Sequence, residues 1–324
     1  ALAFVAFLLM ASDGLALRGR FGGDRFVSAG VAVLVASIAV FTVWPVATLL
    51  GQVFIAPADQ TLLAATAERI LAPKIWSLAC LVSGSSCGVA WNTLALAVST
   101  ATCATALGLA FALIVTRTGF RFKRPLRLLT VMPIITPPFV ISLGLILIFG
   151  RSGIVNQAAN DWFGLELGRW IYGFDGVLLA QVFSFTPTAF LVLIGVVEGI
   201  SPSMEEATQT LRASPMRAFR TVTLPLMRPG LANAFLVVFI ESIADFGNPI
   251  VLGGSFGVLS TEIFFAVVGA QADFGRSAAL ASILLVYALA AFFLQRRVIG
   301  RASYVSMTGK GDGGLPAPLP RPVE

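Results

Sequence analysis

The sequence predicts an all-α, polytopic transmembrane helical bundle. Of the 324 residues, 57% are hydrophobic and only 12% are charged, and the mean hydropathy is +0.90. Apolar segments of about 20 residues, the length that crosses a bilayer as a helix, recur along the chain. Runs such as "LLVYALAAFFL" do not alternate in polarity, unlike the strands of a transmembrane barrel. We therefore expect a protein that crosses a membrane several times.

About seven spans are expected. They lie near residues 1–17, 27–50, 89–115, 127–149, 174–199, 229–252 and 275–295. The chain starts inside an apolar run without a charged n-region, so we expect the first span to be truncated and favour this over a signal peptide. Residues 1–85 are expected to form N-terminal spans and an external loop, 86–297 a core, and 298–324 a cytoplasmic linker rich in Gly and Pro.

Basic residues sort the loops into two sides of the membrane. One side holds 17 of the 22 Lys and Arg residues. These are Arg18, Arg20, Arg25, Arg117, Arg121, Lys123, Arg124, Arg127, Arg212, Arg217, Arg220, Arg228, Arg296, Arg297, Arg301, Lys310 and Arg321. Because Lys and Arg concentrate in cytoplasmic loops, this side is expected to be the cytoplasm. The same distribution accounts for most of the net charge of +6 without a nucleic-acid partner.

Several kinds of chemistry are not expected. Histidine is absent and the cysteines are Cys80, Cys87 and Cys103, which leaves no common zinc site and no His-based acid–base pair. No GxxxxGK[ST] sequence occurs, so ATP binding by a Walker loop is not expected. We expect no catalytic residue, metal or cofactor. Cys80 and Cys87 could form a disulfide in an oxidising compartment, but we favour two small buried side chains.

The polar cytoplasmic loop 201–228 carries two helix-start signals. Ser201 and Pro202 form an N-cap and N1 pair, and Glu205 and Glu206 follow near the positive helix N-terminus. Apolar residues on one face of this first helix are Met204, Ala207 and Leu211. Helices of about ten residues are unstable alone in water. Their apolar faces are therefore expected to pack on the spans, on the membrane surface or on a partner protein.

The second start signal in this loop is Ser214 followed by Pro215. Met216, Phe219 and Val222 form an apolar stripe after it, and Pro225 is expected to close the unit. The sequence thus predicts a pair of short helices. Without further information, docking to a protein and resting on lipid headgroups are equally compatible with this pair.

This loop resembles the cytoplasmic signature of binding-protein-dependent ABC transporter permeases. The signature is Glu-Ala-Ala, three residues, Gly, nine residues and Ile-x-Leu-Pro. Glu206-Ala207-Thr208, Arg212 and Val222-Thr223-Leu224-Pro225 fall at this spacing. The likeness extends from about Trp91 to Arg297. Arg212 stands where the family has Gly, and a non-Gly residue in the left-handed region costs about 1 kcal/mol or more, so the local turn is expected to differ.

The resemblance implies that the loop docks into a separate ATP-binding cassette ATPase subunit and transmits its movement. Residues implied in this coupling are Glu205, Glu206, Ala207, Leu211, Arg212, Phe219, Leu224 and Pro225. The other implied partners are a periplasmic solute-binding protein, a second permease half and membrane lipid. The implied location is the bacterial inner membrane, with multiple passes.

The segment "FIESIADFGNPIVLGG" places polar residues inside a predicted span. Glu241 and Asp245 are expected on one helix face, and each carboxylate costs roughly 2.5–3.5 kcal/mol at a helix centre in a membrane. Asn248-Pro249 is expected to break the helix. We favour a translocation path lined by Glu241, Asp245 and Asn248 over an interhelical polar clamp. Three prolines in "TVMPIITPPFVISLG" predict that the span near 127–149 is kinked or interrupted.

Within the superfamily, "IADFGNPIVLGG" and "STEIFFAVVGAQADFGRSAAL" are most similar to ferric-iron permeases. Those proteins usually join two permease halves, and "SYVSMTGKGDGG" resembles the segment between them, so the chain resembles a first half. This implies ferric iron uptake. Thiamine, phosphonate, sulfate and polyamine permeases are related alternatives. A rival from another class is a secondary transporter that uses Glu241 and Asp245 as ion sites.

Overall fold

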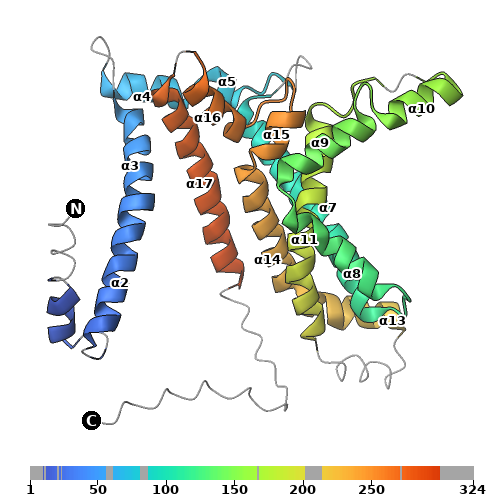
Figure 1. The fold of residues 1–324 in the computed structure, drawn as a ribbon, viewed down its shortest axis with the longest axis horizontal. Coiled ribbons are helices and arrows are strands. Elements are labelled where there is room, and N and C mark those ends of the chain that lie inside the picture. The colour runs from blue at the N-terminus through green and yellow to red at the C-terminus, as the bar shows by residue number, and fades with distance from the viewer. Residues whose placement is uncertain are drawn as a thin grey trace. The chain divides into compact units, whose positions relative to one another are not determined.

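The computed structural model describes residues 10, 12–19, 22, 24–55, 61–80, 87–165, 168–200, 214–270 and 272–299. The chain divides into two compact units, which are described separately. Unit 1 comprises Ala1–Ala90 and Leu259–Leu285, and unit 2 comprises Trp91–Val258 and Val286–Glu324. Helices make up the structure of both units (Figure 1).

The helices before the core are α2 (Arg25–Ile38), a π-helical turn (Ala39–Val43), α3 (Trp44–Gly51), a 3₁₀ turn (Gln52–Phe54), α4 (Leu62–Ile70) and α5 (Pro73–Trp76). The next are α7 (Val89–Arg117), α8 (Lys123–Val131), a 3₁₀ turn (Met132–Ile135), α9 (Pro138–Phe149), α10 (Ile154–Phe163) and α11 (Phe174–Glu198). The last are α13 (Pro215–Ala218), a π-helical turn (Phe219–Thr223), α14 (Leu224–Ala244), α15 (Gly247–Leu252), α16 (Leu259–Val268) and α17 (Phe274–Ile299).

Six helices of the described residues are long and apolar enough to cross a membrane. They are Arg25–Phe54, Val89–Arg117, Pro138–Phe163, Phe174–Glu198, Met216–Ala244 and Phe274–Arg297. The helical fold class is therefore confirmed. The expected first span lies mostly outside the described residues. Large apolar side chains along these helices are exposed, as lipid-facing surface requires.

Two of the predicted spans have other bounds: the structure has Pro138–Phe163 where 127–149 was expected, and Met216–Ala244 where 229–252 was expected. The helix expected near 127–149 is interrupted between α8 and α9, where Met132–Ile135 form a 3₁₀ turn and Pro137 has extended backbone. This interruption was expected from the three prolines, because Pro lacks an N–H and its ring strikes the preceding turn. The span expected at 229–252 begins earlier and ends at Ala244, ahead of a separate helix α15.

The outer part of unit 1 is held together by charged side chains. Arg69 donates hydrogen bonds from its guanidinium to the carbonyl oxygens of Gln52, Val53 and Ile55, at 3.3, 3.1 and 2.9 Å. It thereby caps the end of the first described span. The carboxylate of Glu262 forms ion pairs with Lys74, at 3.0 Å, and with Arg276. The Arg69 contacts join α4 to the end of the first described span, and the Glu262 ion pairs join α5, α16 and the start of α17.

Cys80 and Cys87 form a disulfide in unit 1, with their Cα atoms 4.8 Å apart. The preference for two unbonded buried residues is therefore wrong. Gly88 N donates to Ser77 O at 2.7 Å, and a Cβ on Gly88 would lie 2.3 Å from Ile75 O. This close approach brings the two cysteines within bonding range.

The disulfide is expected to stabilise the purified protein. For cysteines seven positions apart, loop-closure entropy predicts that Cys80→Ser/Cys87→Ser lowers the free energy of unfolding by about 2 kcal/mol. Thermal unfolding in detergent with and without dithiothreitol measures this: reductant should lower the midpoint of the wild type but not that of the double variant. Cys103→Ser is the control, because Cys103 is exposed and unbonded. A wild-type unfolding midpoint that does not change with reductant would contradict the disulfide.

Unit 2 is built round α11. In its most apolar window 61% of the residues are buried, against 33% or less in every other span described. Helices α8, α9, α14 and α15 all pack on α11. A hydrophobic cluster that includes Phe190, Leu193 and Met227 lies along it. The neighbouring helices of unit 2 are therefore positioned by their packing on α11.

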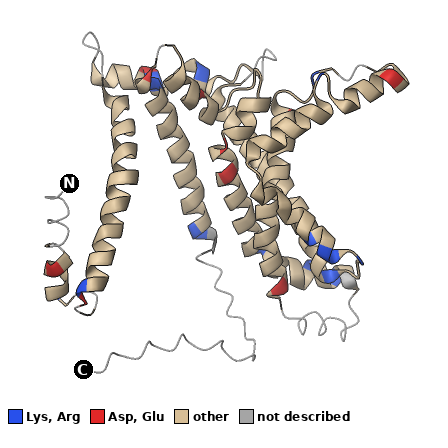
Figure 2. Ribbon diagram, in the orientation of Figure 1, with Lys and Arg blue, Asp and Glu red and all other residues tan. Residues whose placement is uncertain are grey.

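Figure 2 shows Lys and Arg residues gathered at the end of unit 2 where α8 begins and α13 lies. Those near the start of α8 include Arg121, Lys123, Arg124 and Arg127, and α13 adds Arg217. Segments that are some 90 positions apart in the sequence thus share one basic end. This agrees with their assignment to one side of the membrane.

Candidate functional site

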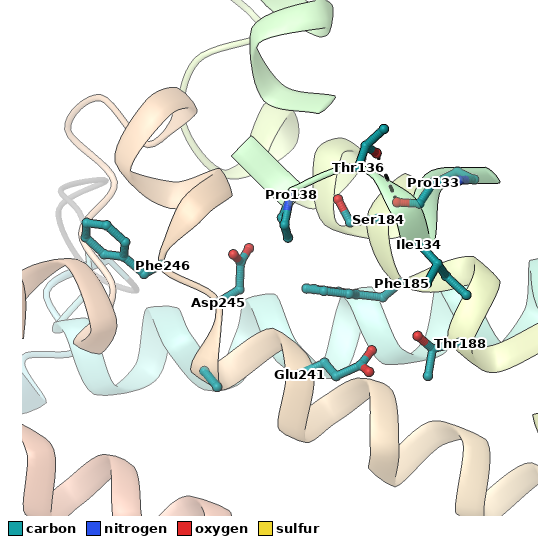
Figure 3. Close-up of a pocket in the computed structure, with 11 residues that line it drawn as sticks. Pro133, Ile134, Thr136, Pro138, Ser184, Phe185, Thr188, Glu241, Asp245 and Phe246 are labelled. Carbon is teal, nitrogen blue, oxygen red and sulfur yellow. Dashed lines mark hydrogen bonds between the residues drawn. The ribbon is translucent and has the colours of Figure 1, made fainter. Parts of the chain in front are cut away.

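A cavity of about 510 Å³ lies in unit 2 where two interrupted helices face α11. Its lining residues are Pro133, Ile134, Thr136, Pro138, Ser184, Phe185, Thr188, Glu241, Ala244, Asp245 and Phe246. Figure 3 shows Glu241, Asp245, Phe185 and Thr188 around one space, and Thr136 Oγ1 donates to Pro133 O at 2.9 Å. Chain interruptions inside a membrane are tolerated where backbone is buried in protein or lines a cavity.

Glu241 is the acid on the helical part of this wall. It lies one turn before the end of α14, and its carboxylate points toward the Thr188 hydroxyl of α11 (Figure 3). The Oε2 atom is buried and has no hydrogen-bond partner among the described residues. A buried acceptor without a donor is costly. This oxygen is therefore available to a donor or cation that enters the cavity.

Asp245 lies beyond the end of α14, with extended backbone at φ −68° and ψ 122°. The prediction that it shares a helix face with Glu241 is therefore wrong. Its Oδ2 atom accepts hydrogen bonds from Gln181 Nε2 at 2.9 Å and from Asn248 Nδ2 at 2.8 Å. Its Oδ1 atom accepts from the backbone N–H groups of Gly247 at 2.9 Å and Asn248 at 3.3 Å. Four donors fill the acceptor sites of this carboxylate.

Asn248 does not line the cavity, because its side chain is fully buried behind the wall. Its Oδ1 atom accepts from Ser142 Oγ at 2.7 Å, and its Nδ2 atom donates to Asp245 and, at 3.4 Å, to Ser184 Oγ. The predicted helix break at Asn248-Pro249 is wrong. The break lies at residues 245–246, and Pro249 lies in the first turn of the next helix, α15, where no N–H is required.

The sequence patterns did not single out Gln181, Ser142 and Thr100, which complete the polar network behind the cavity. All three are fully buried. Thr100 Oγ1 donates to Gln181 Oε1 at 2.9 Å, so α7 joins the network. Polar side chains inside a membrane span are rare and are usually functional or paired. A Gln in the middle of an apolar helix was the available signal.

The predicted coupling residues Glu205, Glu206, Ala207, Leu211 and Arg212 lie outside the described residues. Of the remaining three, Phe219, Leu224 and Pro225 are each half-buried at the basic end of unit 2. Ser214 caps the second start signal, accepting from Arg217 N at 3.4 Å.

Pro225 does not close a separate short helix as predicted. α13 continues through the π-helical turn into α14, and Met216–Ala244 is one helix of 29 residues. A widened turn at Phe219–Thr223 precedes Pro225, which relieves the clash of the proline ring with the preceding carbonyl. Residues at the basic end of unit 2 and the cavity wall that carries Glu241 therefore belong to the same helix.

A family model described as "Binding-protein-dependent transport system inner membrane component" matches residues 104–304. The chain belongs to this family. It is a multi-pass inner-membrane protein and a transport component.

Curated relatives of this inner membrane component include permeases named for different solutes. FbpB, a ferric transport system permease protein of Actinobacillus pleuropneumoniae, is 39% identical over 298 residues, which is 92% of this chain and 42% of FbpB. ModB, a molybdenum transport system permease protein of Mycobacterium bovis, is 31% identical over 209 residues, which is 63% of this chain and 74% of ModB. The chain thus spans less than half of the ferric permease that it matches.

Solved structures support the same fold. A bacterial ABC transporter that imports the acidic polysaccharide alginate has a TM-score of 0.67 at 17% identity, and covers 84% of this chain and 95% of its own. The MetNI methionine ABC transporter has a TM-score of 0.52 at 17% identity, with 66% and 94% covered. At such identities the likeness concerns the arrangement of helices alone.

Proposed function

We propose that this inner membrane component is the transmembrane permease subunit of an ATP-driven importer, and that a separate ATPase subunit supplies the energy. A periplasmic solute-binding protein delivers the solute, and a second permease half completes the translocation path. Membership of the binding-protein-dependent family supports this assignment.

The observation that carries the proposal is the continuous helix Met216–Ala244. At 1.5 Å per residue, Phe219 at its basic end and Glu241 near its other end are about 33 Å apart. The helix is continuous between these two ends, across the π-helical turn and Pro229. Movement of an ATPase bound at loop 201–228 would therefore reach the cavity through one unbroken helix.

The cavity beside Glu241 is proposed to be a segment of the translocation path. Two interrupted helices meet there, as at the substrate sites of other transporters, where unwound backbone and helix ends face the solute. Asp245 shapes the same wall, and Asn248 holds Asp245 from behind. Of the two acids, Glu241 has the oxygen without a partner and is the one proposed to face the solute.

Ferric iron is the proposed solute, on the strength of 39% identity to a ferric transport permease over most of the chain. The test is uptake of ⁵⁵Fe(III) by vesicles that contain the complete two-half protein, its ATPase and its binding protein. Uptake should require ATP and survive collapse of the ion gradient. Uptake that survives loss of the ATPase would indicate a secondary transporter. Uptake of molybdate, sulfate, thiamine, phosphonate or a polyamine in place of iron would retain the mechanism and replace the solute.

Glu206→Lys is expected to abolish association with the ATPase while the protein still inserts and folds. The match of Glu206 to the family signature supports a role for this acid in docking, and reversing a charge in a desolvated contact costs several kcal/mol. Pull-down of the ATPase by the tagged permease measures the effect. Asp161→Lys on α10, outside the basic end of unit 2, is the control. Undiminished recovery of the ATPase would remove the coupling role from this loop.

A further inference from the structure

Gln181 is a fully buried amide in the first half of α11, and all of its hydrogen-bonding capacity is used. Its Oε1 atom accepts from Thr100 Oγ1 at 2.9 Å and from Ser242 Oγ at 2.6 Å. Its Nε2 atom donates to Asp245 Oδ2 at 2.9 Å and to Ser242 O at 3.3 Å. An amide side chain has two donors and two main acceptor sites. Gln181 therefore has no free group for a solute and acts on its neighbours.

The neighbour with the largest consequence is Asp245, which stands at the joint between α14 and α15. Its Oδ1 atom accepts from Gly247 N and Asn248 N, so it caps the first turn of α15. Its Oδ2 atom is held by Gln181. One carboxylate thus sets the direction in which α15 leaves α14, and Gln181 fixes that carboxylate to α11.

The joint forms part of the cavity wall. Ala244, Asp245 and Phe246 all line the cavity. Beyond the joint, α15 packs on α9 and α11, and a Cβ on Gly247 would lie 3.4 Å from Phe139 N. The joint therefore has little room to change its angle while the Asp245 hydrogen bonds are intact.

We propose that Gln181 is a positioning residue that holds Asp245 and thereby fixes the α14–α15 joint and the shape of the cavity wall beside Glu241. The inference rests on the proposed function, because the cavity matters only if solute passes through it. Gln181 itself touches no solute. Its role is exerted through the carboxylate that it binds.

Gln181→Glu tests the proposal because it replaces the donor by a group that donates only when protonated. At low pH one of the two carboxyl groups is protonated and restores the hydrogen bond, whereas at high pH both ionise and repel each other. The carboxylates that face the introduced group are Asp245 and, on the cavity side, Glu241. Helices α9 and α15 carry no charged residue, α7 and α11 carry theirs (Arg117, Asp175 and Glu198) at helix ends, and α14 adds only Arg228 near its basic end.

Transport by the complete transporter, relative to wild type at the same pH, is expected to fall at least tenfold at pH 8 in Gln181→Glu and to recover to within threefold at pH 5.5. Gln181→Met, of similar volume but without a donor, should lose transport equally at both pH values. Gln157→Glu on the exposed face of α10 is the matched control and should show no dependence on pH. Full transport by Gln181→Glu at pH 8, or an equal loss at both values, would overturn the positioning role.

A second readout does not depend on transport. Ala244 is exposed at the joint. The rate at which a membrane-impermeant maleimide labels Ala244→Cys, in a Cys103→Ser background, therefore reports the geometry of the joint. Gln181→Glu should change this rate, relative to the parent at the same pH, at pH 8 but not at pH 5.5. An unchanged rate at pH 8 contradicts the inference. A changed rate together with normal transport by Glu241→Gln would keep the positioning role and reject the proposed path.

Discussion

Gly108→Ala is expected to destabilise the protein, although Ala normally favours a helix over Gly. A Cβ at Gly108 on α7 would lie 2.8 Å from the backbone N of Phe190 and 2.9 Å from the Cβ of Ala189, both on α11. Backbone atoms cannot rotate away, so α7 and α11 would have to separate. Overpacking of this kind costs about 1–3 kcal/mol, and this contact lies on the most buried helix described.

The matched control for this substitution is Gly144→Ala on α9. No atom lies within 4 Å of a Cβ there, so the substitution should stabilise the helix by about 0.5–1 kcal/mol. Opposite shifts in the thermal unfolding midpoint of the two purified variants are the expected result. Equal shifts would mean that the contact between α7 and α11 is looser than the structure shows.

Glu241→Gln is expected to reduce transport at least tenfold while membrane insertion and the unfolding midpoint stay unchanged. The buried Oε2 atom has no partner among the described residues, and Gln keeps an oxygen that can accept the hydrogen bond with Thr188. A hydrogen bond or ion pair from a charged solute to this oxygen is worth about 1.5–3 kcal/mol, which corresponds to about a 10- to 100-fold effect. Uptake of labelled solute by vesicles, at matched protein level, is the measurement.

Glu198→Gln is the control for that experiment, because Glu198 is exposed at the end of α11 and outside the cavity. Its transport should match that of the wild type. ATPase recovery in pull-down should be normal in both variants. If Glu241→Gln transports at the wild-type rate, the cavity acid is not part of the translocation path, and the helix that carries it serves packing alone.

The sequence predicted the helical spans because apolar runs of bilayer length are a strong and local signal. It also predicted the interruption near Pro133 and Pro137, since proline chemistry acts within one turn. It did not predict that Pro225 continues a helix, because the outcome depends on a π-helical turn that no short pattern reveals. By contrast, the prediction of a helix start at Ser214 and Pro215 is confirmed.

The polar wall was only partly predictable. Because a carboxylate inside a membrane is energetically costly, the sequence indicated Glu241 and Asp245 as candidate site residues, and both line one cavity. The two acids differ in their hydrogen-bond partners, which depend on tertiary structure. Asp245 accepts from four donors on three residues, whereas Glu241 has an oxygen without a partner. Partners contributed by α11 cannot be assigned to α14 by spacing alone. For the same reason, the sequence did not indicate a role for Gln181.

The disulfide between Cys80 and Cys87 has a consequence for how the chain's topology can be established. Thiols persist in the reducing cytosol and oxidise once translocated. The oxidation state of this pair in intact cells is therefore a chemical record of which face of the bilayer the segment reached, and it requires no count of positive charges.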